Sequence, residues 1–138
     1  MMANILPTLQ SGLPVLLAQF AAALVLLGLG YLCYMRLTPF HEIALIRQGN
    51  VAAGVVAMGT LVALSLPIAA TLASSHVVLD IVIWGLVALI IQLGAFVLAT
   101  KLMRGLPAMI EAGNVAAGLL VIGIQIAIAI LNAGAMMG

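Results

Sequence analysis

Charged residues are scarce in this chain, and their scarcity excludes most classes of protein. Only 5% of the 138 residues are charged, with 4 Lys and Arg, 3 Asp and Glu, and a formal net charge of +1. A soluble domain carries about a quarter charged residues, so the surface of this chain could not stay in water. Four basic residues cannot neutralise a phosphate backbone, which excludes a nucleic-acid-binding protein. An integral membrane protein remains.

Cysteine and alternating polarity are also lacking. The single cysteine, Cys33, excludes an internal disulfide. Polar and apolar residues do not alternate with the period of two that is typical of outer-membrane strands. Runs such as residues 15–29 and 81–91 are instead apolar on every side. Because backbone amides in lipid must bond within their own segment, these runs predict helices.

The chain does contain four long uncharged stretches, in a composition that is 67% hydrophobic. About 20 apolar residues in a helix cross a hydrocarbon core of roughly 30 Å, so each stretch allows one crossing. We therefore predict an all-α membrane protein with four transmembrane helices in a single membrane domain, residues 1–138. The expected spans are Leu13–Met35, Asn50–Leu72, Asp80–Thr100 and Ile110–Met136.

The cations predict the orientation of these spans. Arg36 and Arg47 lie between the first and second spans, and Lys101 and Arg104 lie between the third and fourth. All four therefore fall on one side of the membrane. By the positive-inside rule, we expect both basic loops in the cytoplasm and both termini on the outer side.

The chain also repeats itself. The hexapeptide that begins at Gly49 recurs unchanged from Gly113, an offset of 64 residues. Both copies open a predicted span just after a charged loop, which indicates duplication of a two-helix hairpin. We expect two parallel tandem repeats, about residues 13–74 and 78–136, related by an approximate two-fold axis along the membrane normal. The same offset pairs further glycines: Gly30 with Gly94, and Gly59 with Gly123.

The repeated hexapeptide is rich in small residues. Small residues four apart let membrane helices approach closely, and an asparagine near the boundary can bond across helices for about 0.5–2 kcal/mol. We interpret the motif as a helix-packing surface; the alternative is a binding or ion-coordinating role for the two asparagines. The motif residues are Gly49, Asn50, Ala53, Gly54, Gly113, Asn114, Ala117 and Gly118.

Two carboxylates, Glu42 and Glu111, lie close to the basic loops. Thr38 before Pro39 predicts the N-cap and first residue of a short interfacial helix, with Glu42 in its first turn. The structural interpretation makes both carboxylates helix-start residues. The alternative makes them a pair at the cytoplasmic mouth of a pathway. The 64-residue offset pairs Glu111 with Arg47, which weakens that alternative.

Polar residues within the expected spans include Thr60 and Gln92, both near mid-depth. A buried amide in hydrocarbon is costly unless it is bonded, so these side chains should face other helices. They either bond between helices or line a path; the candidate polar path consists of Thr60, Gln92, Glu42 and Glu111. No charged residue lies at mid-depth, which argues against a proton-coupled pump.

A set of short motifs runs through both halves: Leu37-Thr38-Pro39-Phe40-His41-Glu42, Ile46-Arg47, Asn50-Val51-Ala52-Ala53, Gly59-Thr60-Leu61, Trp84-Gly85, Ile91-Gln92-Leu93 and Asn114-Val115-Ala116-Ala117-Gly118. Together they resemble the YjfL-like family of bacterial inner-membrane proteins, also described as domain of unknown function 350. The resemblance covers the chain from about residue 13 onward. It implies a four-span inner-membrane protein made of two two-helix units. In an inner membrane, the outer side on which the positive-inside rule places both termini is the periplasm. The resemblance implies no catalytic or binding residue.

No Walker loop, dinucleotide-binding glycine motif, HExxH or GxSxG occurs, and we expect no enzyme activity, no cofactor and no metal. The favoured hypothesis is a non-enzymatic subunit in the lipid bilayer that forms a homo-oligomer or joins a membrane-complex partner through small-residue faces. The second hypothesis is a small transporter or channel with a polar path near Asn50, Asn114, Thr60 and Gln92. A membrane enzyme acting on lipid or polyamine-like substrates ranks third, because paired groups for acid–base work are lacking.

Overall fold

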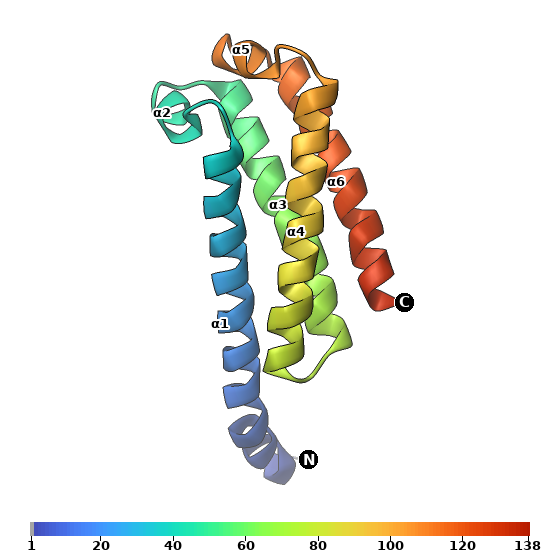
Figure 1. The fold of residues 1–138 in the computed structure, drawn as a ribbon. Coiled ribbons are helices and arrows are strands. Elements are labelled where there is room, and N and C mark those ends of the chain that lie inside the picture. The colour runs from blue at the N-terminus through green and yellow to red at the C-terminus, as the bar shows by residue number, and fades with distance from the viewer. Residues whose placement is uncertain (1) are drawn as a thin grey trace.

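The computed structural model describes residues 2–138, which form four long helices, two short helices and one 3₁₀ turn (Figure 1). No strand occurs within this described range. The elements are η1 (Met2–Asn4), α1 (Ile5–Leu37), α2 (Glu42–Arg47), α3 (Val51–Ser74), α4 (Val78–Leu102), α5 (Leu106–Glu111) and α6 (Val115–Met137).

The four long helices, α1, α3, α4 and α6, are each long and apolar enough to cross a membrane. This confirms the prediction of an all-α membrane protein with four transmembrane helices. The helices alternate in direction along the chain, so that α1 runs parallel to α4 and α3 runs parallel to α6 (Figure 1). The short helices α2 and α5 lie together at one end of the bundle (Figure 1).

The bundle has α3 and α4 at its centre. The closest pairing is that of α3 with α6, while α1 packs against both α3 and α4. The helices α1 and α6 lie on opposite sides of the central pair (Figure 1). A two-fold axis would bring α1 against α6 as closely as α3 lies against α4. The expected two-fold relation of the halves is therefore wrong, and the second hairpin is displaced sideways along the first.

Two boundaries differ from the expected spans by more than two residues. Helix α1 begins at Ile5 rather than at Leu13, and within its first turns the Thr8 hydroxyl donates to the Asn4 carbonyl at 2.6 Å. At the other end of the chain, Ile110 belongs to the separate helix α5, and the last span begins at Val115. The expected continuous span from Ile110 is thus interrupted by a turn.

The predicted cap at Thr38 is also wrong. Thr38 ends α1, with an extended backbone and its hydroxyl donating to the Tyr34 carbonyl at 2.6 Å. The residue before a proline is disfavoured in the helical region, so Pro39 ends α1 instead of starting the next helix. Helix α2 begins three residues later at Glu42, which does lie in its first turn, as expected.

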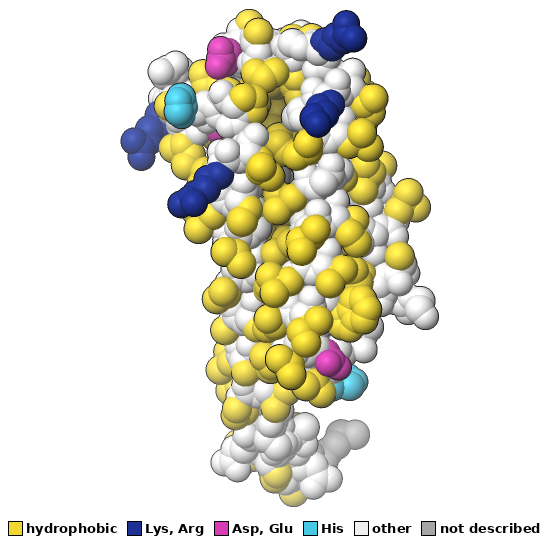
Figure 2. Space-filling model, in the orientation of Figure 1, with side chains coloured by type: hydrophobic (Ala, Val, Ile, Leu, Met, Phe, Trp, Pro, Cys, Tyr) yellow, Lys and Arg dark blue, Asp and Glu magenta, His cyan; other side chains and the backbone are white. Residues whose placement is uncertain are grey.

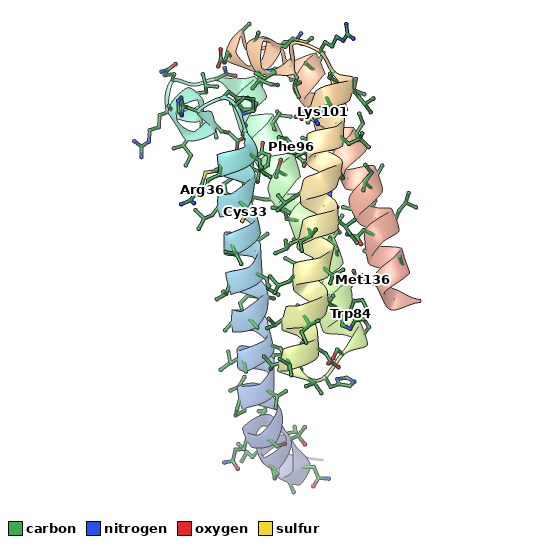
Figure 3. All side chains as sticks on the ribbon, in the orientation of Figure 1. Cys33, Arg36, Trp84, Phe96, Lys101 and Met136 are labelled. Carbon is green, nitrogen blue, oxygen red and sulfur yellow. The ribbon has the colours of Figure 1, made fainter. Side chains whose placement is uncertain are left out.

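The four cations and two of the three acidic residues lie at the end that carries α2 and α5, whereas Asp80 lies in the first turn of α4 at the other end. Figure 2 shows the lysine and arginine side chains toward this end, and below them a long surface on which the coloured side chains are hydrophobic except for one acidic and one histidine side chain near the other end. Arg36 and Lys101 lie near this end, whereas Trp84 and Met136 lie toward the other (Figure 3). We call the end with α2 and α5 the charged end.

Candidate functional site

The repeated Gly-Asn pair forms the same turn in both halves of the chain. Gly49 and Gly113 each have a φ of +83°, a left-handed conformation that costs glycine nothing. The amide after Gly49, that of Asn50, donates to the Leu45 carbonyl at 3.0 Å, and Gly49 donates to Ile46 at 2.9 Å. This pattern is a Schellman motif that ends the short helix α2. Matching bonds follow Gly113 at the end of α5.

The asparagine of each pair then starts a spanning helix. The Oδ1 atom of Asn50 accepts from the Ala53 amide at 3.1 Å, and that of Asn114 accepts from the Ala117 amide at 3.2 Å. Asparagine is among the best N-cap residues because it satisfies a free amide of the first turn. The two Gly-Asn pairs therefore turn the chain from a short interfacial helix into a long membrane helix.

The amide group of Asn50 has a second role that Asn114 does not share. Its Nδ2 donates to the Ile110 carbonyl at 2.8 Å and to the Glu111 carbonyl at 3.3 Å. These carbonyls belong to the last turn of α5, where helix carbonyls lack partners within their helix. Asn50 thereby ties the first hairpin to the second. Within residues 2–138, no equivalent bond is made by the amide of Asn114, whose side chain is exposed.

The other small residues of the hexapeptides are divided between the bundle interior and its surface. Ala53 and Ala117 are buried, as is Gly118. A β-carbon on Gly118 would lie 3.3 Å from the Ala52 carbonyl oxygen, so glycine permits the close contact of α3 with α6. Gly54, the repeat counterpart of Gly118, is partly exposed, and a β-carbon there would meet nothing within 4 Å.

At the charged end, Glu42 is buried against two tyrosines of α1. Only 3% of its surface is exposed. The Tyr31 hydroxyl donates to Oε1 of Glu42, and the Tyr34 hydroxyl donates to Oε2 at 2.6 Å. Tyr34 in turn packs edge-on against Phe96 of α4, with ring centroids 4.6 Å apart. The carboxylate therefore joins the start of α2 to the end of α1.

Burial controls the acidity of this carboxyl group. Loss of solvent raises the pKa of Glu42 above its ordinary value, and the hydrogen bonds from Tyr31 and Tyr34 oppose that rise. Both carboxylate oxygens are occupied by phenol donors, so the group is held in place by its neighbours.

Glu111 has a different environment from Glu42. It is exposed and is the last residue of α5, so the expectation of a helix-start carboxylate at Glu111 is wrong. Its carbonyl, rather than its carboxylate, takes part in the bond from Asn50. The two glutamates thus contribute different groups to different contacts at the charged end.

Thr60 and Gln92, the polar residues expected at mid-depth, are both buried. The Thr60 hydroxyl donates to the Val56 carbonyl of its own helix at 2.7 Å. The Gln92 amide donates across to the Gln125 carbonyl of α6 at 2.9 Å. Two buried side-chain amide atoms have no hydrogen-bond partner: Oε1 of Gln92 and Nε2 of Gln125.

Asn132 adds a second polar bond between α4 and α6, from its Nδ2 to the Ala88 carbonyl at 3.2 Å. Together with Gln92, it fastens the second hairpin at two depths. The sequence does not identify α4 as the partner, but as polar residues within the last expected span both Asn132 and Gln125 are predicted to face another helix. Their spacing of seven residues, two helical turns, places them on one face of α6 and is the signal that the sequence offers.

The four cations lie around the charged end. Arg36 is in the last turn of α1, and Arg47 ends α2. Lys101 is in the last turn of α4, and Arg104 lies in the turn between α4 and α5. A cation in the last turn of a helix also interacts favourably with the negative end of the helix dipole.

Comparisons with known proteins agree with this architecture. The chain matches the family described as "Domain of Unknown Function (DUF350)" over residues 8–136. It is 33% identical over 103 residues to the UPF0719 inner membrane protein YjfL of Escherichia coli (strain K12), covering 75% of this chain and 78% of that protein. The protein of the same name from Escherichia coli O157:H7 matches with the same figures. No solved structure gives a significant match.

Proposed function

This chain belongs to the DUF350 family, and we propose that it acts in the bacterial inner membrane as a non-enzymatic subunit that assembles with further copies of itself. One observation carries the proposal. The hexapeptide glycine that is used for close helix contact in the second half, Gly118, has a counterpart in the first half, Gly54, whose helix surface is left open. A face of this kind suits contact with another helix. Lipid gives no hydrophobic force that drives helices together, so association depends on close packing, which a small residue permits.

The use of the buried polar groups supports the non-enzymatic part of the proposal. The amides of Asn50, Gln92 and Asn132 each donate to a backbone carbonyl of another helix. Such bonds hold helices together, and they leave these amides engaged in the fold. Glu42, the buried carboxyl group, is held by two tyrosines. Acid–base catalysis requires a group that is free to reach a substrate proton.

The proposed topology places the charged end in the cytoplasm and both termini in the periplasm, according to the positive-inside rule. It is tested by replacing Cys33 with alanine and introducing His76→Cys or Lys101→Cys separately. A membrane-impermeant maleimide added to cells with a permeable outer membrane should label the His76→Cys chain alone. Labelling of Lys101→Cys from the periplasm would contradict the orientation.

The assembly itself is tested by counting subunits in membrane nanodiscs prepared directly from cells. We expect more than one copy of the wild-type chain in each particle. Gly54→Leu should reduce the number of copies, because the new side chain fills the open face. Gly12→Leu is the matched control, since Gly12 also meets nothing within 4 Å but its repeat counterpart, His76, lies in the loop between α3 and α4. A single wild-type copy in each particle would refute self-assembly.

A small channel is the second candidate function, and one specific observation favours it. Gln92 Oε1 and Gln125 Nε2 are buried without partners, which leaves polar atoms in the membrane interior that water or a polar solute could satisfy. Proteoliposomes loaded with ions or small solutes test this candidate. Flux that is lost in Gln92→Leu, with the subunit number unchanged, would support it, and absence of flux in the wild type would exclude it.

A further inference from the structure

Four glycine pairs occupy equivalent positions in the two repeats. Gly49 and Gly113 form the turns described above, and in each of the other three pairs one glycine is packed and the other is open. A β-carbon on any packed member would lie within 3.3 Å of an atom in the other repeat: Gly30, Gly59 and Gly118. A β-carbon on any counterpart, 64 residues away, would meet nothing within 4 Å: Gly94, Gly123 and Gly54. Each repeat thus carries an equivalent set of packing positions, and at each position only one of the two repeats is in contact with its neighbour.

Each packed glycine contacts a specific residue across the interface between the hairpins. A β-carbon on Gly59 would lie 2.3 Å from Cγ2 of Ile122, and one on Gly30 would lie 2.6 Å from Cδ2 of Leu89. Both contacts join the first hairpin to the second. Equivalent contacts can be written between the second hairpin of one copy and the first hairpin of another. In each, the first-hairpin residue is replaced by its counterpart 64 positions later, and the second-hairpin residue by its counterpart 64 positions earlier. We call these the shifted contacts.

The shifted contacts fall on residues that are exposed in this chain. The contact of Gly59 with Ile122 becomes one of Gly123 with Met58, whose exposed fraction is 52%. The contact of Gly30 with Leu89 becomes one of Gly94 with Val25, which is 69% exposed. In each case an open glycine of the second hairpin is matched to a large exposed side chain of the first hairpin.

The hydrogen bond between the two hairpins also has a shifted equivalent whose partners are exposed. The bond from the Asn50 amide to the Ile110 carbonyl becomes, after the shift, a bond from Asn114 to the carbonyl of Ile46. The Asn114 side chain is exposed, and Ile46 lies at the end of the equivalent short helix in the first half with 39% of its surface exposed. The same short helix, Schellman turn and N-cap are therefore present on both sides of the vacant contact.

We propose that the vacant faces bind each other between copies of this chain, so that α4 and α6 of one copy pack on α1 and α3 of the next copy in the way that α1 and α3 pack on α4 and α6 within the chain. This inference rests on the proposed function and names the surface by which the copies assemble. The repeats are related sideways rather than by a two-fold axis, so the contact is head-to-tail. Head-to-tail contacts close into rings or continue as rows.

The bilayer is compatible with this arrangement. Equivalent helices of the two repeats run in the same direction, so a copy added beside the second hairpin keeps the same topology (Figure 1). Its charged end then lies level with that of the first copy, and its cations stay on the same side of the membrane. On α3, Val56 and Gly59 face α6, and Met58 lies about 200° around the helix from Val56 and about 100° from Gly59, so the shifted contact uses a different side of the helix. One copy can thus contact a neighbour on each side.

Disulfide crosslinking between two differently tagged chains tests the head-to-tail contact. Both chains carry Cys33→Ala; one carries Met58→Cys and the other carries Gly123→Cys, and they are co-expressed and oxidised in membranes. We expect a crosslinked dimer of the two tags when both variants are present, and little when either is expressed alone. The control replaces Gly123→Cys by Ile130→Cys, two turns or about 10 Å along the same helix, and should crosslink poorly.

The outcomes separate this inference from the proposed function. Crosslinking of Met58→Cys with itself would indicate a two-fold contact and would overturn the head-to-tail arrangement. Absence of the mixed dimer, in membranes where subunit counting still finds several copies of each variant, would overturn the inference and leave self-assembly standing. Single copies of the wild-type chain in those membranes would overturn both.

Discussion

Asn50 and Asn114 allow the stability contribution of a side-chain hydrogen bond between helices to be measured, because both cap a helix but only Asn50 also donates to another helix. Asn50→Asp keeps the oxygen that caps α3 but removes the amide that donates to Ile110 and Glu111. Asn114→Asp makes the same change at the start of α6, where only the capping bond is present among the described residues. Aspartate caps helices about as well as asparagine, so the capping contribution cancels.

The expected difference follows from the value of a hydrogen bond between membrane helices. Such bonds contribute about 0.6 kcal/mol on average and about 1.7 kcal/mol at most. Asn50→Asp should therefore lower the free energy of unfolding by about 0.6–1.7 kcal/mol, which is about a 3-fold to 18-fold change in the unfolding equilibrium. Repulsion between the new carboxylate and the α5 carbonyls acts in the same direction. Asn114→Asp should change the stability little.

The measurement is reversible unfolding by denaturing detergent, followed by circular dichroism, at dilutions where chains are single. Dilution matters because a neighbouring copy would supply a partner for Asn114. Equal losses of stability in the two variants would refute the reasoning, since the Asn50 amide bond would then contribute nothing. Asn50→Ala and Asn114→Ala provide a second comparison, in which both should lose about 1 kcal/mol of capping and only Asn50→Ala should lose more.

Two further predictions concern packing and pH. Gly59→Ala should destabilise the chain by about 1–3 kcal/mol, because its β-carbon would overlap Ile122, whereas Gly28→Ala should leave the stability unchanged or raise it by up to about 1 kcal/mol; thermal unfolding measures both. The raised pKa of Glu42 means that the folded state binds the proton more tightly than the unfolded state. The free energy of unfolding should therefore be greatest below the ordinary carboxyl pKa and fall as the pH rises through the folded pKa, and Glu42→Gln should remove that part of the slope. A wild-type stability that rises over the same pH window relative to Glu42→Gln would contradict this prediction.

Part of the candidate site follows rules that act within a few residues. The Gly-Asn pair at Gly49 and Asn50 is typical of a helix stop followed by a helix start, yet the interpretation of the sequence rests on the small size of its residues and on a bond across helices. The geometry assigns Gly49 to the turn and Asn50 to the cap and the bond across the hairpins. The Glu42 partners could not be identified in this way, since they depend on how α2 folds back against Tyr31 and Tyr34.

Sequence alone determined the class of the protein, the number of membrane helices and the clustering of its cations at one end. These features depend on the length and polarity of each segment alone. In lipid every backbone amide must bond within its own helix, so each segment forms its helix independently of the others. Tertiary structure alone decided which copy of each repeated glycine is packed, as with Gly118 against Gly54. The spanning helices are apolar on every side, so no stripe of polarity marks the face that meets a neighbour, and only the sideways placement of one hairpin on the other fills one face and leaves its equivalent vacant.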